Sequence, residues 1–298
     1  MKDPAFVKIL SMECVDLAID MGRPDGTVIK DLPKYRRMMP YFMKTKAESV
    51  IFYEFLVDAE NGLEFAERMS KELNENVTFF NLVVHALFKV YVAYPGINRF
   101  VKAGKVYDRN GIWFTMTVKK PGGKEGYVSL VKKELEPGFT FADSVRAAKK
   151  EIKKARSKSP DAGEKEAKSY LKFPHFLIRL GFPFYKFMEE HGLFSRSYME
   201  KEVFFCSAIL TNLGAFGGHA NFHHLYEIGT CPVFLTLGKI EERPVVRDGK
   251  IVIRKIAPIR VTVDERGEDG FIFYRGLVLF VDQLENPEKL LEPAERIE

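Results

Sequence analysis

The order of apolar and polar residues predicts helices and strands in alternation along most of the chain. Helical spacing of apolar residues marks 62–74, 78–94, 140–158 and 271–284. Because 78–94 is apolar almost all round, we expect a central buried helix there. Period-two alternation marks the strand segments 49–58, 111–119, 126–132, 203–211, 233–240 and 256–263. This order predicts an α/β (α+β) two-layer sandwich, with helices packed on a mixed β-sheet.

A hairpin is predicted near the C-terminal end of this pattern. The sequence Arg247-Asp-Gly-Lys250 lies between the apolar runs Pro244-Val-Val and Ile251-Val-Ile. Asp and Gly tolerate the positive φ angles that a two-residue type I′ turn requires. We therefore expect the chain to reverse at this dipeptide.

The segment 157–202 differs from the rest because it is rich in Phe and interrupted by Pro and Gly. Pro174 and Pro183 stand in an otherwise helical pattern. Since proline lacks a backbone donor and clashes with the preceding turn, we expect short broken helices rather than one long helix. Three roles stay open for this insertion: a packing layer or oligomer contact, a lid over an acyl group, or a patch on a membrane surface.

Composition and charge narrow the class of protein. Hydrophobic residues make up 46% and charged residues 29% of the 298 residues, which favours a large core and excludes general disorder. The net charge of +5 is too small to indicate a nucleic-acid partner. No apolar run reaches the ~18 residues of a membrane span, and the N-terminus lacks the apolar core of a signal peptide. Cys14, Cys206 and Cys231 are too scattered for a disulfide framework. We therefore expect a cytoplasmic protein with reduced thiols.

Two segments carry candidate chemistry, because in each a predicted strand runs directly into small or polar residues. The first is Ala208-Ile-Leu-Thr-Asn-Leu-Gly-Ala-Phe-Gly217. The second is Ile259-Arg-Val-Thr-Val-Asp-Glu-Arg-Gly-Glu-Asp-Gly270. Strand ends of this kind present polar groups to a ligand from a rigid scaffold.

Together these segments resemble the catalytic domain of the dihydrolipoamide acyltransferases of 2-oxo acid dehydrogenase complexes, and of their relative chloramphenicol acetyltransferase. Thr211-Asn-Leu-Gly214 is similar to the family's Ser/Thr-Asn-Leu-Gly strand end. Asp264-Glu-Arg-Gly-Glu-Asp-Gly270 is similar to its Asp-His-Arg-x-x-Asp/Asn-Gly motif, except at the second position. Arg36-Arg37-Met38 and the hairpin also follow the family's order. The resemblance covers about 33–287, apart from 157–202.

This resemblance implies a chloramphenicol acetyltransferase-like, coenzyme A-dependent acyltransferase fold. It implies a single catalytic domain over 1–298, with 157–202 as a Phe-rich helical insertion and no lipoyl or peripheral-subunit-binding domain. It also implies a homotrimer with its active site at the subunit boundary, and it leaves higher assembly open. The acyl group would then come from coenzyme A or from a lipoyl-type carrier on another protein.

The resemblance also assigns roles to single residues. In the family a histidine at the position of Glu265 takes a proton from the attacking thiol or hydroxyl, and a Ser or Thr at the position of Thr211 hydrogen-bonds to the tetrahedral oxyanion. Asp269 matches the motif's supporting acid, and Arg36 or Arg37 would be its ion-pair partner. Contacts with coenzyme A are expected for the polar and basic residues around these motifs, which are Asn212, Arg266, Arg36 and Arg37.

Glutamate in place of histidine changes the expected chemistry. A carboxylate of pKa ~4.3 is about 2 units less basic than imidazole, a handicap of about 3 kcal/mol in proton transfer. Desolvation would raise the pKa of Glu265, whereas Arg266 would lower it. His223 and His224, in the loop after Thr211, are alternative bases. A metal site of these histidines with Glu227 is the weaker interpretation, so no metal is expected.

The leading hypothesis is therefore an acyltransferase. It would move an acyl group from a coenzyme A or lipoyl thioester to a thiol, hydroxyl or amine acceptor. No Gly-rich phosphate loop is present, so a nucleotide cofactor is not expected. The alternative is a catalytically inactive homologue that keeps the trimeric scaffold and binds a ligand or a protein partner.

Overall fold

The computed structural model describes residues 22–119, 128–156 and 172–297. Within these ranges a seven-stranded sheet runs in the order β2–β10–β8–β7–β5–β6, and β9 pairs with β10. Strand pairs are antiparallel except β5–β7 and β7–β8, which are parallel. The sheet is thus mixed, as predicted. Its strands are β2 (Val50–Asp58), β5 (Ile112–Lys119), β6 (Val128–Leu135), β7 (Ala208–Asn212), β8 (Val233–Leu237), β9 (Glu241–Arg247) and β10 (Lys250–Asp264).

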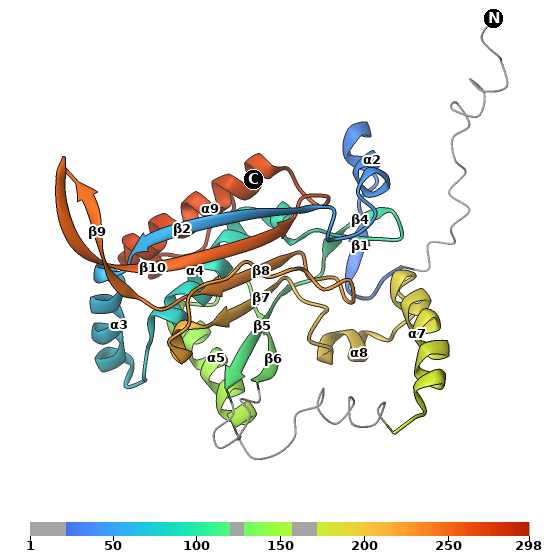
Figure 1. The fold of residues 1–298 in the computed structure, drawn as a ribbon, viewed down its shortest axis with the longest axis horizontal. Helices are drawn as coiled ribbons and strands as arrows, with labels where there is room; N and C mark the ends of the chain where they lie inside the picture. The colour runs from blue at the N-terminus through green and yellow to red at the C-terminus, as the bar shows by residue number, and fades with distance from the viewer. Residues whose placement is uncertain (1–21, 120–127, 157–171, 298) are drawn as a thin grey trace, which may run out of the picture.

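Helices cover one face of this sheet, as Figure 1 shows. The helices of this layer are α3 (Glu60–Leu73), α4 (Phe79–Ala93), α5 (Phe141–Arg156) and α9 (Gly270–Glu285). Almost every side chain of α4 is buried, which confirms the predicted central helix. Alternate sheet residues, including Leu210 of β7 and Val261 of β10, join the core beneath these helices.

The turns at the edges follow their residue types. At the tip of the β9–β10 hairpin, Asp248 and Gly249 have φ angles of 51° and 74°, so the predicted turn is confirmed. The helix α4 begins with a capping box, in which the Thr78 backbone N–H donates to Asn81.

A smaller sheet of the order β1–β4–β3 lies beside the larger one. It consists of β1 (Gly26–Val28), β3 (Phe100–Lys102) and β4 (Lys105–Arg109), and the helix α2 (Lys34–Phe42) follows β1 in the chain. The sequence did not predict these strands, because segments of three to five residues give too few alternations to recognise.

The structure corrects the prediction for the insertion. A single helix α7 (His175–Glu190) runs through Pro183, followed by the short helix α8 (Arg196–Lys201). Pro174 forms the N-cap of α7 rather than a break. Pro183 is exposed, so water can solvate the carbonyl that its missing N–H leaves unpaired. The residues 157–171 of this insertion lie outside the described ranges.

The strand predicted over 203–211 is also shorter than expected. Regular pairing begins only at Ala208. Before it, the Phe204 carbonyl accepts hydrogen bonds from the backbone N–H groups of Thr230 and Cys231, and the Ser207 N–H donates to the Trp113 carbonyl. The apolar residues of this segment therefore pack in a turn instead of extending the strand.

Candidate active site

Thr211 lies near the end of β7, on the face of the sheet opposite to the helices. Its neighbour Leu210 points into the helix-covered core, so alternation directs Thr211 to the other face. The Thr211 side chain is buried, and its Oγ1 accepts a 2.7 Å hydrogen bond from Thr117 Oγ1 of β5. Because the Thr117 hydroxyl supplies the proton of this bond, the proton of Thr211 is left to donate to a ligand.

A row of polar side chains extends from Thr211 across the sheet. The register pairs Thr211 with Thr236 of β8, Thr236 with Arg260 of β10, and Arg260 with Glu54 of β2. Residues paired in register point to the same face. Arg260 Nε donates to Glu54 Oε1 at 2.8 Å, and Arg260 Nη1 donates to the Ala220 carbonyl at 2.7 Å. The face of the sheet opposite to the helices, called the open face below, is therefore polar and partly basic along this row.

The loop after β7 crosses this open face and places His223 above it. Thr236 Oγ1 donates to the Asn221 carbonyl, which holds the loop over β8. The His223 ring then stacks on Phe234, with centroids 4.0 Å apart and planes within 6°. Phe234 pairs with Ile209, which lies two residues before Thr211 on the same face, so His223 lies over the strand position next to the row of Thr211.

The tautomer of His223 follows from its hydrogen bond. Its Nδ1 lies 2.7 Å from the His224 carbonyl oxygen, which can only accept. Nδ1 therefore carries a proton, and in the neutral ring Nε2 holds the lone pair. His224 itself is exposed, and its ring contacts those of His223 and Tyr226. Of the two predicted histidines, His223 is therefore the one held against the sheet.

Asn212 and Gly214 shape the turn that ends β7. Asn212 Oδ1 accepts a 3.0 Å hydrogen bond from the Ala215 N–H. A Cβ at Gly214 would lie 2.4 Å from the Gly238 carbonyl oxygen, so only glycine fits this approach of two backbone segments. Asn212 thus contacts the protein's own backbone, and the predicted contact with coenzyme A would use its remaining amide group.

Glu265 and Asp269 lie together beyond the other end of the sheet, before α9. Asp269 is the N-cap of α9, and its Oδ1 accepts a 2.8 Å hydrogen bond from the Phe271 N–H. Tyr53 of β2 lies beside both carboxylates and donates to the Gly270 carbonyl at 3.4 Å. Burial, and then the negative charges of Glu265 and Asp269, raise the pKa of Tyr53. A proton is therefore held firmly on this phenol next to the Glu265 carboxylate.

Thr211 and Glu265 are far apart within one chain. Thr211 shares its register row with Arg260, and Glu265 follows five residues later in the chain. Five extended residues span roughly 16 Å. One chain therefore does not bring Thr211 and Glu265 to the same reacting atom.

Of the three predicted arginines, Arg266 and Arg36 are buried and bind other groups of the protein, whereas Arg37 is exposed. Arg266 is buried and pairs with both oxygens of Asp264, at 2.9 and 2.7 Å, and donates to the carbonyls of Met43 and Lys44. Burial alone lowers the pKa of Arg266, but the hydrogen bond and charge of Asp264 outweigh it and raise the pKa. These contacts argue against the predicted role of Arg266 in binding coenzyme A.

Arg36 is also buried, and its partner differs from the predicted one. Its guanidinium donates to the Glu265 carbonyl at 3.2 Å and to Glu268 Oε1 at 3.4 Å. The carboxylate partner of Arg36 is therefore Glu268 rather than Asp269, because Asp269 turns back to cap α9. Arg37 is exposed on α2 and keeps its predicted availability for a ligand.

Other parts of the described chain add no further chemistry to this site. Within the described ranges, no group of three His, Cys, Asp or Glu side chains is placed to hold a metal ion. In the same ranges, each helix is too short or too polar to cross a lipid bilayer. Cys206 and Cys231 are buried free thiols.

The sequence reasoning missed Thr117, Arg260 and Tyr53. Thr117 and Arg260 occupy alternate, polar positions in otherwise apolar strands. Such positions were a recognisable signal for a polar face. The position of Tyr53 depends on the pairing of β2 with β10, which no local pattern indicates.

Comparison with known proteins agrees with this fold. The family described as 2-oxoacid dehydrogenases acyltransferase (catalytic domain) matches residues 199–292, about a third of the chain. No curated protein sequence matches the chain. The dihydrolipoamide acetyltransferase of Azotobacter vinelandii is 16% identical, with a TM-score of 0.58 over 89% of this chain and 94% of that one.

Two further solved structures share the fold. The cubic core of a pyruvate dehydrogenase multienzyme complex has a TM-score of 0.59 and 14% identity, over 89% of this chain and 94% of that one. A chloramphenicol acetyltransferase has a TM-score of 0.51 and 15% identity, over 90% of this chain and 100% of that one. The predicted resemblance and the chloramphenicol acetyltransferase-like fold are thus confirmed.

Proposed function

We propose that this protein is an acyltransferase that moves an acyl group from a coenzyme A or lipoyl thioester to a thiol, hydroxyl or amine acceptor. The observation that carries the proposal is the pairing of two groups on the open face of the sheet. Thr211 has a hydroxyl proton free to donate. His223 donates its Nδ1 proton to the His224 carbonyl, so its Nε2 is the atom that can accept a proton. Acyl transfer requires such a donor and such a base.

The two groups would take complementary roles in this reaction. The base contacts the nucleophile at about 2.6–3.2 Å, and the donor contacts the carbonyl oxygen, so the reacting atoms lie between them. The His223 ring stacks on Phe234, which pairs with Ile209 two residues before Thr211, so both groups lie on the face opposite to the helices. His223 Nε2 would take the acceptor's proton as the acceptor attacks the thioester carbon. Thr211 would donate to the oxyanion, and collapse of the intermediate would expel the carrier thiolate, which takes the proton from His223 Nε2.

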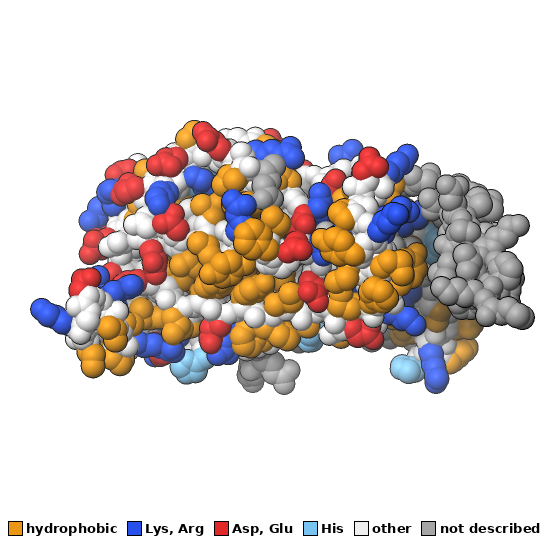
Figure 2. All heavy atoms as spheres, turned by 90° about the horizontal axis from the view of Figure 1, so that it is seen from above, with side chains coloured by type: hydrophobic (Ala, Val, Ile, Leu, Met, Phe, Trp, Pro, Cys, Tyr) orange, Lys and Arg blue, Asp and Glu red, His pale blue; other side chains and the backbone are white. Residues whose placement is uncertain are grey.

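Association of copies belongs to the proposal as well. Hydrophobic side chains form a band along the face that lies uppermost in Figure 1, as Figure 2 shows. The helix α9, which lies along this side of the molecule, exposes Phe271, Tyr274 and Val278, whose side chains are about half exposed or more. Apolar patches of this extent are typical of interaction surfaces. We therefore propose that the chain forms a homotrimer.

Glu265 and Asp269 have a role in an alternative version of the site. In the A. vinelandii enzyme, a serine, a histidine and an asparagine were studied for their role in catalysis, and the histidine and asparagine are four positions apart. Glu265 and Asp269 have the same spacing. In this version Glu265 of one copy would act on an acyl group held by Thr211 of another.

The experiment is an acyl-transfer assay on the purified protein. Acetyl- and longer acyl-coenzyme A are incubated with dihydrolipoamide or a small alcohol, and the acylated acceptor is measured by mass spectrometry. We expect Thr211→Val to lower kcat about 100- to 1,000-fold and His223→Gln to lower it about 100-fold or more. His219→Gln, an exposed histidine in the same loop, is the matched control and should keep wild-type activity.

The results also separate the alternatives. Loss of activity in Glu265→Gln with His223→Gln unaffected would transfer the role of base to Glu265. No acylated acceptor with any carrier, from a protein that still binds acyl-coenzyme A, would contradict the enzyme proposal and favour the inactive homologue.

A further inference from the structure

The helix α7 presents an apolar face that no other described element covers. The side chains of Phe176, Leu180 and Phe184 are 68%, 75% and 64% exposed. The rest of this face consists of Leu177 and Phe187, which are also exposed, and Phe173 just before the helix is exposed as well. The intervals from Leu177 through Leu180 and Phe184 to Phe187 are three, four and three residues, so these side chains lie on one side of the helix.

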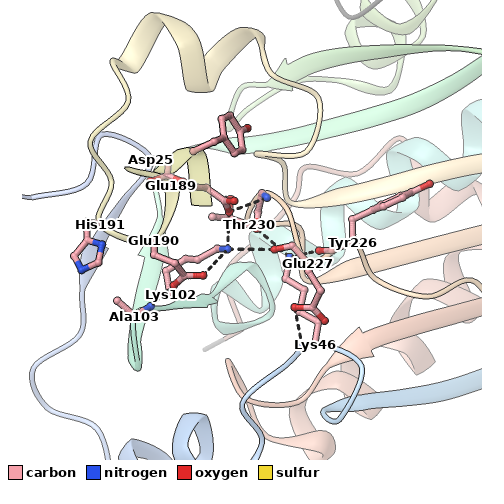
Figure 3. A network of polar contacts seen from close by, with 12 residues as sticks. Asp25, Lys46, Lys102, Ala103, Glu189, Glu190, His191, Tyr226, Glu227 and Thr230 are labelled. Atoms are coloured by element: carbon pink, nitrogen blue, oxygen red, sulfur yellow. Dashed lines mark hydrogen bonds and ion pairs between the residues drawn. The ribbon is translucent and has the colours of Figure 1, made fainter. Parts of the chain in front are cut away.

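The opposite side of α7 attaches the helix to the rest of the protein. The Tyr185 ring packs on Phe194, 5.0 Å between centroids, and its hydroxyl lies 3.3 Å from that of Tyr198. Glu189 is buried, forms a 2.5 Å ion pair with Lys102 and accepts a 2.8 Å hydrogen bond from the Gly229 N–H. The network around Glu189 and Glu190 is drawn in Figure 3. The apolar face is therefore held outward by a fixed attachment.

Charge is distributed unequally around this helix. Arg179 and Lys186 are exposed and seven residues apart, so they lie in one stripe beside the apolar face, and Lys172 is exposed just before the helix. No acidic residue occurs between positions 172 and 188. The nearest carboxylates belong to Glu189 and Glu190, and both bind Lys102. Among the described residues, an approaching surface therefore meets an apolar strip with the positive charges of Arg179 and Lys186 along one edge.

We propose that α7 docks on an anionic lipid surface, with its apolar face inserted between the lipid headgroups. A helix that carries Phe and Leu on one side and Lys and Arg beside them has the composition of an interfacial helix. The helix is about 24 Å long and lies at the periphery of the molecule in Figure 1, clear of the helices that cover the sheet.

A second copy related by a twofold axis fits this face less well, whereas a contact of α7 with a different surface of the next copy is one outcome of the test below. A symmetric contact of two α7 helices would bring the cation stripes of both copies to one seam, and the segment 172–188 supplies no carboxylate to neutralise them. Anionic headgroups supply that negative charge. The docking site is independent of the catalytic proposal, because neither Thr211 nor His223 belongs to α7.

The test is flotation of the full-length protein with lipid vesicles at low and high salt. One set of vesicles is phosphatidylcholine with about 30% phosphatidylglycerol, and the other is phosphatidylcholine alone. We expect the wild type to float with the anionic vesicles and at least tenfold less with the neutral ones. Leu180→Glu with Phe184→Glu should lower the partition coefficient at least tenfold, because it places two charges on the inserted face. Arg179→Gln with Lys186→Gln should lower it about 25-fold, about fivefold for each cation removed.

A matched control places the same charges elsewhere. Val246→Glu with Ile251→Glu changes two apolar side chains that are 69% and 78% exposed on the β9–β10 hairpin, and it should leave flotation unchanged. Thermal unfolding checks that each variant is folded. Absence of flotation at low salt, or equal flotation of Leu180→Glu with Phe184→Glu, would overturn the proposal. So would a wild type that does not float but loses its oligomeric mass in that variant, because α7 would then be a contact between copies.

Discussion

Arg266 shows how a residue of a recognisable motif can serve the fold instead of a ligand. It lies between Glu265 and the N-cap of α9, where the sequence predicts a contact with coenzyme A. Its guanidinium instead pairs with Asp264, which is itself 2% exposed and accepts a hydrogen bond from Ser49. The pair fixes the end of β10 to the loop after α2, through the carbonyls of Met43 and Lys44.

This placement predicts the effect of removing one member of the pair. Arg266→Met leaves the buried Asp264 carboxylate without its cation, so we expect the free energy of unfolding to fall by about 3–5 kcal/mol. Adding Asp264→Asn should recover part of that loss, because the remaining buried group is then uncharged. Urea unfolding of both variants measures the effect. A stable Arg266→Met variant that binds acyl-coenzyme A more weakly would instead restore the predicted binding role.

The elements of the main sheet and its helices could be predicted from the sequence because their patterns are long. The buried helix α4 and the β9–β10 hairpin have extended local signals, and both are found where expected. The smaller sheet and the course of α7 could not be predicted. The strands β1, β3 and β4 are too short for a pattern, and the exposed position of Pro183 depends on what α7 packs against.

The buried His85 of α4 predicts that the stability of the fold depends on pH. His85 is buried on α4, and its Nδ1 lies 2.8 Å from Ser144 Oγ of α5. Burial, and then the charge of Lys89, lower the pKa of His85 to about 4. Between pH 6.5 and 4 the unfolded chain therefore takes up a proton that the folded chain does not. Stability is full above pH 6.5 and falls by about 3 kcal/mol as the pH decreases to 4.

The measurement compares urea unfolding of the wild type and His85→Gln at several pH values. Glutamine does not titrate. Between pH 6.5 and 4 the free energy of unfolding of the variant should therefore fall less steeply than that of the wild type, and the remaining fall comes from other titrating groups. Equal slopes for the two proteins would show that His85 is protonated in the folded state.

At the scale of the whole molecule, the positions of the candidate residues were only partly predictable. The motifs place Thr211 and Glu265 at strand ends, but only the register shows that these ends lie at opposite sides of the sheet. The position of His223 depends on how its loop crosses β8, a long-range contact with Asn221 and Phe234 that no local sequence pattern indicates. We therefore propose that Thr211 acts with His223 of the same chain, and that Glu265 would reach Thr211 only of another copy.

Mixing of inactive variants tests this arrangement most directly. Thr211→Val, His223→Gln and Glu265→Gln are each produced with distinct tags and co-expressed in pairs, and the mixed oligomers are assayed for acyl transfer. If Thr211 and His223 act within one chain, oligomers of Thr211→Val with His223→Gln contain no chain with both groups and stay inactive. The account predicts this result, together with an active Glu265→Gln protein. Recovery of activity in oligomers of Thr211→Val with Glu265→Gln, each inactive alone, would contradict it and place the reaction between Thr211 of one copy and Glu265 of the next.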